Sequence, residues 1–417
     1  MGRAMKDSGI EWIGKIPENW KFDQGKYHFT NNKYVVGTKS INYDRLALTM
    51  NGVIHRNKED NEGLQPNDFN SYQLLRKNEL VFKLIDLQNI ATSRVGLAHD
   101  TGIVSPAYVV LHAIDINSSY AEKFYLMMWH RQIFNALGDS GVRSNLSAGD
   151  LLNVRIPFPP LEEQQKISAF LDDKCEEIDA IIAKIQEQIT TLEEYKKSVI
   201  SETVTKGLNP NAPMKDSGIE WIGQIPVNWE IEKGKYCLSY LQKPVRPTDE
   251  VITCFRDGEV TLRKNRREDG FTMSDKEIGY QGIDVGDLIV HGMDGFAGAI
   301  GISDSRGKAS PVLNVLDTNQ NKSYIMYYLR SMAYNGVFIA LATGIRVRTC
   351  DTNWGKLKEL PYPLPSKKEQ NRIVDYINEQ LSQTNDIIAD KQKQIETLEE
   401  YKKTLIYEYV TGKKEVA

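Results

Sequence analysis

The sequence predicts an α+β protein with two copies of one unit, each a variable domain followed by a long helix. A frame at 5–20, MKDSGIEWIGKIPENW, returns at 214–229 with 14 of 16 positions identical. A second frame, ITTLEEYKK at 189–197, returns as IETLEEYKK at 395–403. The segments between the frames share almost nothing. Matched frames around unlike middles predict one fold with two different surfaces, which suits a molecule that reads two unlike halves of an extended partner.

The repeats and the turn-forming segment Asn209-Pro210-Asn211-Ala212-Pro213 divide the chain. A length of 417 residues leaves each part enough chain for its own core. The predicted boundaries are 1–160 for the first variable domain, 161–207 for the first helix, 208–213 for the linker, 214–364 for the second variable domain and 365–412 for the second helix.

Each long helix carries apolar residues at alternating spacings of three and four, as in a coiled-coil seam. Gly207 and Gly412 fit the two C-terminal stops. Such a stripe needs burial, and the other copy is the natural partner, so we expect an antiparallel coiled coil with pseudo-two-fold symmetry. Thr384 and Lys391 replace apolar seam residues; they are register devices, contacts to another subunit or ordinary repeat drift. The seam positions are Leu171, Cys175, Ile178, Ile182, Ile185 and Ile189, then Ile377, Leu381, Thr384, Ile388, Lys391 and Ile395.

The sequence pattern of the variable domains is typical of small α+β domains. A strand at 46–50 before Asn51-Gly52 matches one at 251–255 before Asp257-Gly258, which predicts a tight hairpin in each domain. Further matched segments are short buried strands at 79–82 and 287–290, segments at 104–111 and 309–316, and single amphipathic helices at 124–137 and 324–341.

The bulk composition excludes several classes of protein. No apolar run approaches the roughly 18 residues of a membrane span, and the N-terminus lacks an apolar signal region, so we expect a cytoplasmic protein. Four dispersed cysteines without a CxxC motif, and six scattered histidines, predict neither disulfides nor a metal site. A net charge of −4 counts mildly against nucleic acid, although a basic patch can lie on an acidic protein.

Signatures of catalysis are missing as well. The nearest approach to a phosphate-binding loop, Gly301 to Lys308, has the wrong spacing and is followed by alanine. No GxGxxG follows a strand, and no carboxylate pair with a nearby lysine resembles a nuclease site. We therefore expect no catalytic residues and no cofactor on this chain.

Basic and polar residues gather in loops at matching places in the two domains. His55-Arg56-Asn57-Lys58 follows the first hairpin and 263–267 follows the second, while 141–145 corresponds to 344–348. A single charge run is usually a solvated face, but arginine and lysine suit phosphates, and arginine and asparagine suit base edges. The candidate DNA-binding residues are Arg56, Asn57, Lys58, Lys83, Arg94, Arg143, Asn145, Arg263, Lys264, Arg266, Arg267, His291, Arg346 and Arg348.

Several motifs together resemble the specificity subunit of type I restriction-modification systems. They are the duplicated DSGIEWIGxIPxxW, the helix start PLEEQQKI at 160–167, LEEYKK at 192–197 and TVTKG at 203–207. The second helix start, LPSKKEQNRI at 364–373, departs from the pattern. The resemblance extends over the whole chain.

The resemblance implies two target-recognition domains, separated by conserved spacer helices, that each read half of a bipartite, asymmetric site in double-stranded DNA. It implies no chemistry on this subunit. The expected partners are two methyltransferase subunits and, through them, restriction subunits, with S-adenosylmethionine, ATP and magnesium bound to those partners. Shared phosphate contacts would also explain why this chain is not basic overall.

The repeated frames then become candidate surfaces for those partners, because interfaces favour tryptophan. The residues are Trp12, Ile13, Trp20, Trp221, Ile222 and Trp229. The same tryptophans could instead tie each domain to its helix. Two other functions stay open: a specificity subunit for a fused methyltransferase-nuclease, as in type IIB-like systems, and a coiled-coil adaptor with two protein-binding heads.

Overall fold

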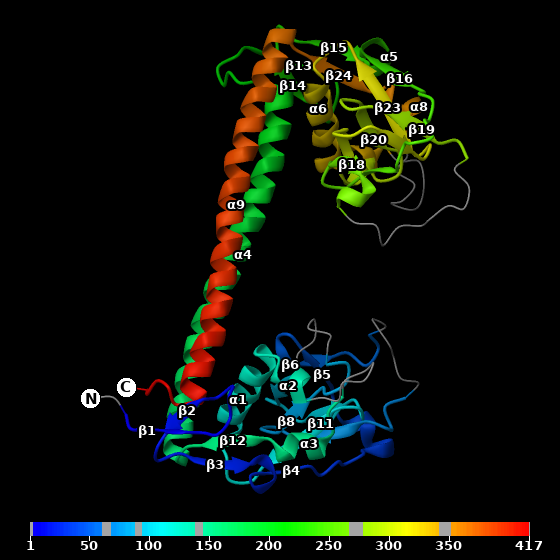
Figure 1. The fold of residues 1–417 in the computed structure, drawn as a ribbon. Coiled ribbons are helices and arrows are strands. Elements are labelled where there is room, and N and C mark those ends of the chain that lie inside the picture. Colours follow the sequence, from blue (N-terminus) through cyan, green and yellow to red (C-terminus); the bar gives the residue numbers. More distant parts are fainter. Residues whose placement is uncertain are drawn as a thin grey trace. The chain divides into compact units, whose positions relative to one another are not determined.

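A computed structural model describes residues 3–60, 68–87, 94–137, 145–266, 278–341 and 352–416. The chain divides into two compact units, of which the first combines two separate stretches of the sequence (Figure 1). Unit 1 consists of Met1–Ile185 and Lys393–Ala417, and unit 2 of Gln186–Gln392. Each unit therefore contains one variable domain and a part of both long helices.

Two four-stranded sheets form the centre of the first variable domain, with strand orders β6-β5-β10-β7 and β4-β11-β8-β9. Of the small two-stranded sheets, β1-β2 is formed by the N-terminal frame, and β12-β3 contains the strand that leads into the first long helix. The strands are β1 Met5–Asp7, β2 Lys15–Pro17, β3 Lys21–Gln24, β4 Phe29–Thr30, β5 Arg45–Thr49, β6 Gly52–Arg56, β7 Gln73–Leu75, β8 Leu80–Phe82, β9 Val95–Leu97, β10 Gly102–Val104, β11 Val109–Ala113 and β12 Arg155–Phe158.

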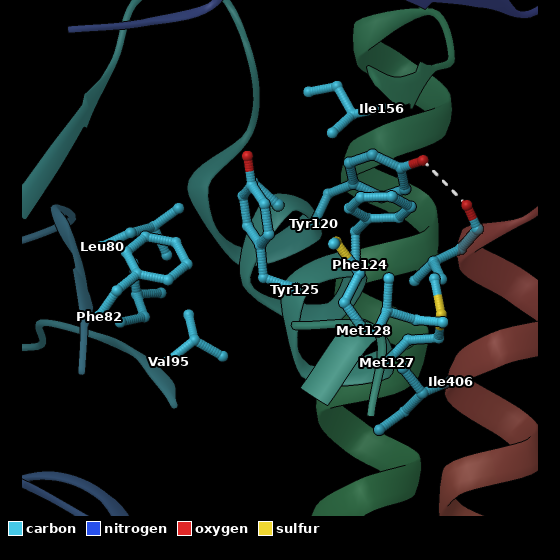
Figure 2. Close-up of a cluster of buried hydrophobic side chains, with 14 of the residues drawn as sticks. Leu80, Phe82, Val95, Tyr120, Phe124, Tyr125, Met127, Met128, Ile156 and Ile406 are labelled. Carbon is cyan, nitrogen blue, oxygen red and sulfur yellow. Dashed lines mark hydrogen bonds between the residues drawn. The ribbon is translucent and has the colours of Figure 1, made fainter. Parts of the chain in front are cut away.

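Helix α1 (Ser118–His130) buries Tyr120, Ala121, Phe124, Tyr125, Met127 and Met128 in the core of unit 1, whereas α2 (Ile133–Leu137) and α3 (Ala148–Asn153) are short. In Figure 2, aromatic and methionine side chains of α1 lie between strand residues such as Phe82 and the helix residue Ile406. The predicted single helix at 124–137 is wrong. The chain turns at Gln132, whose φ of 56° is left-handed and ends a helix.

Unit 2 repeats this plan with one difference. The sheet β16-β23-β20-β21 corresponds to β4-β11-β8-β9, but the other sheet consists of two separate pairs, β17-β18 and β19-β22. The strands are β13 Met214–Asp216, β14 Gln224–Pro226, β15 Glu230–Lys233, β16 Leu238–Leu241, β17 Ile252–Cys254, β18 Val260–Leu262, β19 Gln281–Ile283, β20 Leu288–His291, β21 Ile300–Ile302, β22 Gly307–Ala309, β23 Leu313–Thr318 and β24 Pro361–Leu364.

The helices of the second domain are α5 (Gly234–Cys237), α6 (Lys322–Tyr334), α7 (Val337–Ala340) and α8 (Trp354–Leu357). The predicted single helix at 324–341 is again broken, here at Gly336 with a φ of 70°. Both predicted hairpins are confirmed, as β5-β6 and β17-β18. The segments 104–111 and 309–316 each end one strand, make a turn and begin the next.

Helices α4 (Leu161–Lys206) and α9 (Lys367–Val410) match the predicted long helices. In unit 1, the ring of Phe170 packs at a tilt against Tyr409, with 4.6 Å between ring centroids, and Asp179 accepts from Lys402 Nζ at 2.6 Å. Since the numbers rise along α4 while they fall along α9, the helices are antiparallel there.

In unit 2 the same order holds. Gln188 accepts from Lys391 Nζ at 2.6 Å, and Tyr195 donates to Gln380 Oε1 at 3.2 Å. Thr384 is buried and its hydroxyl donates to the carbonyl of Gln380 in its own helix. Both unusual seam residues are thus satisfied within the chain, and the antiparallel arrangement is confirmed within each unit.

Candidate nucleic-acid interface

The repeated frame of each unit forms a joint between the variable domain and the start of a long helix. Trp20 donates from Nε1 to Glu163 at 3.0 Å, and Trp229 donates to Glu369 at 3.1 Å. Both indole rings are buried, as are Ile13 and Ile222. The prediction that these four residues contact a partner is wrong, because burial in the joint leaves them inaccessible.

The remaining two frame tryptophans also face inward. Trp12 is half-buried with its ring centroid 6.1 Å from that of Phe124, and Trp221 is half-buried against the core of unit 2. The alternative function of the frames, to tie each domain to its helix, is therefore the one that the structure supports.

The basic hairpin of the first domain presents Arg56 at the end of β6, followed by Asn57 and Lys58. Arg56 Nε donates to Asp60 at 2.6 Å, and Lys58 Nζ donates to the carbonyl of Ser40 at 2.9 Å. The exposed Asn57 accepts from the amide of Glu59 through its side chain. These bonds shape the loop and leave its polar surface towards solvent.

The second domain presents a more strongly charged loop at the corresponding place. Arg263 Nε donates to the hydroxyl of Thr253 at 3.2 Å. Lys264 pairs with Glu250, and Arg266 pairs with Asp257 at 2.7 Å and with Glu259 at 3.0 Å. The Arg266 guanidinium also lies 4.2 Å from the ring centroid of Phe255. Carboxylates of the protein thus hold these cationic groups at the surface, and phosphate oxygens of DNA could take the place of the carboxylates.

Backbone pairing shows that Arg56 and Arg263 occupy equivalent positions. Arg56 lies opposite Arg45 in the β5-β6 pair, and Arg45 itself pairs in parallel with Ile103. In the second domain Arg263 donates its amide to Val251, which pairs in parallel with Lys308. Two domains with little sequence in common therefore place an arginine at the same point of the fold.

Other predicted DNA contacts have different surroundings. Arg94 is only 1% exposed, and its guanidinium donates to the carbonyls of Ile85 at 3.0 Å and Asp86 at 2.6 Å. Burial also lowers the pKa of Arg94. The prediction that Arg94 contacts DNA is wrong, because its buried guanidinium binds carbonyls inside the loop. Lys83 is half-buried, and its backbone amide donates to the carbonyl of Arg94.

His291 and Asn145 also organise turns. Nδ1 of His291 accepts from the amides of Met293 and Asp294 at 3.2 and 3.0 Å, and burial lowers the pKa of this histidine. Asn145 is exposed and accepts from the amide of Asp86 at 3.2 Å. The remaining candidates lie outside the described residues: Arg143, Arg267, Arg346 and Arg348.

A repeated pair of exposed residues is not among the predicted site residues. Gly-Lys-Tyr occurs at 25–27 and again at 234–236, and the lysine and tyrosine are exposed in both places. The signal was present in the sequence, but the three-residue repeat is short and lies just beyond the longer frame.

Among the described residues, no cluster of three or more histidine, cysteine, aspartate or glutamate side chains could hold a metal ion. Cys175, Cys237 and Cys254 are buried free thiols. In the described part of the chain, none of the helices is long and apolar enough to cross a membrane.

Comparison with known proteins finds similarity to one protein family. The model of the type I restriction modification DNA specificity domain matches residues 21–191. A protein of Methanocaldococcus jannaschii assigned as the MjaX type I restriction enzyme specificity subunit is 24% identical over 96% of this chain and 95% of its own length. The MjaVIII specificity subunit of the same organism is 40% identical over 83 residues, which cover 20% of this chain and 18% of that protein.

A solved chain from a study of the assembly and conformational transition of the type I R-M system has a similar fold. The match has a TM-score of 0.66 and 14% identity, and it covers 95% of this chain and 99% of the other.

Proposed function

The chain belongs to the family of type I restriction-modification specificity subunits, and from this membership we propose that its two variable domains read the two halves of one bipartite DNA site. As a member, it is a DNA sequence-recognition subunit and has no catalytic activity of its own. It acts in the cytoplasm on double-stranded DNA.

The equivalence of Arg56 and Arg263 carries this proposal. Each arginine begins a surface loop that leaves a hairpin at the same point of the fold, so both loops approach DNA in the same way. The residues that follow differ, with Asn57 and Lys58 in one domain and Lys264 and Arg266 in the other. A shared position with different side chains is what two half-sites of different sequence require, because phosphates position a protein and base edges specify the sequence.

The proposed protein partners are two methyltransferase subunits, with restriction subunits attached through them. Exposed side chains at equivalent positions of the two long helices support two copies of one partner. Unit 1 exposes Ile181 and Tyr401, and unit 2 exposes the corresponding Ile387 and Tyr195. S-adenosylmethionine, ATP and magnesium belong to those partners in this proposal. A fused methyltransferase-nuclease partner would be recognised by copurification.

Methylome sequencing of a host that carries this chain and its methyltransferase tests the function. The expected result is one methylated motif with two specific parts separated by an unread spacer. Replacement of 236–359 by the equivalent segment of a relative should change one part and leave the other intact. A continuous motif, or a change in both parts, would contradict independent reading by the two domains.

A further inference from the structure

A lysine and a tyrosine project from the same tight turn in both variable domains. The turn is the short helix η1 (Gly25–Tyr27) in unit 1 and the start of α5 in unit 2. Tyr27 is 60% exposed and Tyr236 is 68% exposed. In each case the preceding lysine places its ammonium 5.3 Å from the centroid of the tyrosine ring. We call these two pairs, Lys26–Tyr27 and Lys235–Tyr236, the Lys–Tyr turns.

Packing explains the glycine of the repeat but not the two residues after it. The Gly25 amide donates to Val154 and the Gly234 amide to Leu360, both at 2.9 Å. A Cβ atom at Gly234 would collide with the carbonyl of Leu357, so the turn has no room for another residue there. The lysine and tyrosine point to solvent instead, where folding alone places little demand on residue type.

The place of the Lys–Tyr turns separates them from the proposed DNA loops. In Figure 1, β3 and β4, which flank η1, lie at the opposite end of the first domain from the hairpin β5-β6. In the second domain α5 is likewise far from β18, which precedes Arg263. A ligand of the Lys–Tyr turns is therefore distinct from DNA held by these loops.

The same exposed pair in two domains of unlike sequence, with Lys235 alone also 3.7 Å from a carboxylate of Glu359, points to one kind of ligand bound twice. An exposed tyrosine offers a large rigid surface and a hydroxyl, and such residues are enriched where proteins meet. The adjacent ammonium selects a carboxylate at the edge of that contact. We propose that each Lys–Tyr turn docks one copy of the same protein, which covers the ring with apolar surface and pairs a carboxylate with the lysine.

This inference rests on the proposed function, in which the protein bound twice is the methyltransferase subunit. The test uses the full chain coexpressed with that subunit, and native mass spectrometry counts the copies retained. The variants are K26E/Y27A, K235E/Y236A and all four changes together. Each two-residue variant should retain one copy, with at least a tenfold weaker second site, and the four-residue variant should retain none.

The chain provides a matched control. Lys33–Tyr34 is another lysine–tyrosine pair of the first domain, with Tyr34 44% exposed, but Gln242–Lys243 stands at the corresponding place in the second domain. The K33E/Y34A variant should retain both copies. The single changes K26E and K235E keep the rings in place and should weaken one site each, which guards against misfolding of the larger variants.

Two results would overturn the inference alone: two copies retained by the four-residue variant, or normal methyltransferase binding together with lost DNA binding. A wild-type chain that retains no methyltransferase would instead overturn the proposed function and the inference with it.

Discussion

The hydroxyl of Tyr120 lies 3.1 Å from the carbonyl of Val410, to which it donates across 290 residues of sequence (Figure 2). The same hydroxyl lies 3.2 Å from the carbonyl of Pro157, so its one hydrogen is shared between strand β12 and the end of α9. Tyr324 repeats the arrangement with Val204 at 3.1 Å and Pro363 at 2.7 Å. In each unit one tyrosine joins the variable domain to the helix that arrives from the other repeat.

Loss of the Tyr120 hydroxyl should destabilise unit 1. We expect Tyr120→Phe to lower the free energy of unfolding by about 1–2 kcal/mol, because two buried carbonyls lose their donor. Tyr125→Phe is the matched control: this buried hydroxyl on the same helix has no hydrogen-bond partner in the described part of the chain, so its loss should cost little. Urea unfolding measures both, and equal losses would contradict the role given to Tyr120.

Arg94 should matter for folding rather than for DNA contact. Arg94→Met should cost about 2 kcal/mol or more, since several buried carbonyls of one loop lose a charged donor. Arg56→Met, at a partly exposed ion pair with Asp60, should change stability by less than about 1 kcal/mol. Thermal unfolding compares them, and a stable Arg94 variant with selectively weakened DNA binding would restore the original assignment.

Arg266 should contribute to sequence reading by the second domain. We expect Arg266→Ala to weaken DNA binding by about 1–3 kcal/mol and to relax the preference at one base position. Lys322→Ala, which removes a surface ion pair with Asp317 at the start of α6, serves as the control and should bind normally. Binding to a panel of single-base variants of the site distinguishes a base contact from a phosphate contact, which would weaken all sequences alike and reduce the salt dependence.

Unit 1 should lose stability in mild acid through His130. Burial, with help from Lys403 and Lys402 and against the effect of Glu400, lowers the pKa of His130 from 6.5 to about 4. Between these pH values the unfolded chain binds the proton more readily than the folded one. The stabilising contribution is therefore complete above about pH 6.5 and is lost as the pH falls towards about 4.

His130→Tyr tests this dependence, because Tyr334 is the corresponding last residue of α6 in unit 2. Unfolding measured from pH 7 to 4 should show a smaller decline in the variant than in the wild type. Parallel curves would mean that His130 does not titrate differently on folding.

The elements that the sequence predicts well are those whose signal is long. Periodicity over many turns predicted α4 and α9, and their glycine stops at Gly207 and Gly412 adopt φ values of 74° and 68°. The break after α6 is signalled by Asn335-Gly336, but the equivalent break at Gln132 needs a left-handed conformation that glutamine rarely adopts, and tertiary packing imposes it.

Site residues were harder to predict because one residue type serves opposite purposes. Tryptophan suits both an interface and a core, and only the bonds from Trp20 to Glu163 and from Trp229 to Glu369 decide for the core. Arg94 shows the same problem for charge, since the carbonyls that make its burial tolerable belong to a loop whose folding cannot be read from composition. The equivalence of Arg56 and Arg263 emerged only from strand pairing.

Unit 1 is built from two stretches of the chain that are separated by unit 2, so it can be completed only after unit 2 has been synthesised. A ribosome makes the first variable domain before the second, yet Leu405, Ile406 and Val410 of the same core are made only after unit 2. Unit 2 comes from the uninterrupted stretch Gln186–Gln392 and can be finished earlier. Until α9 is made, the nascent first domain therefore exposes apolar surface that the folded protein buries, and such a surface binds chaperones and promotes aggregation. A stop codon within the last turns of α9 would therefore damage the first variable domain, which lies far upstream in the sequence.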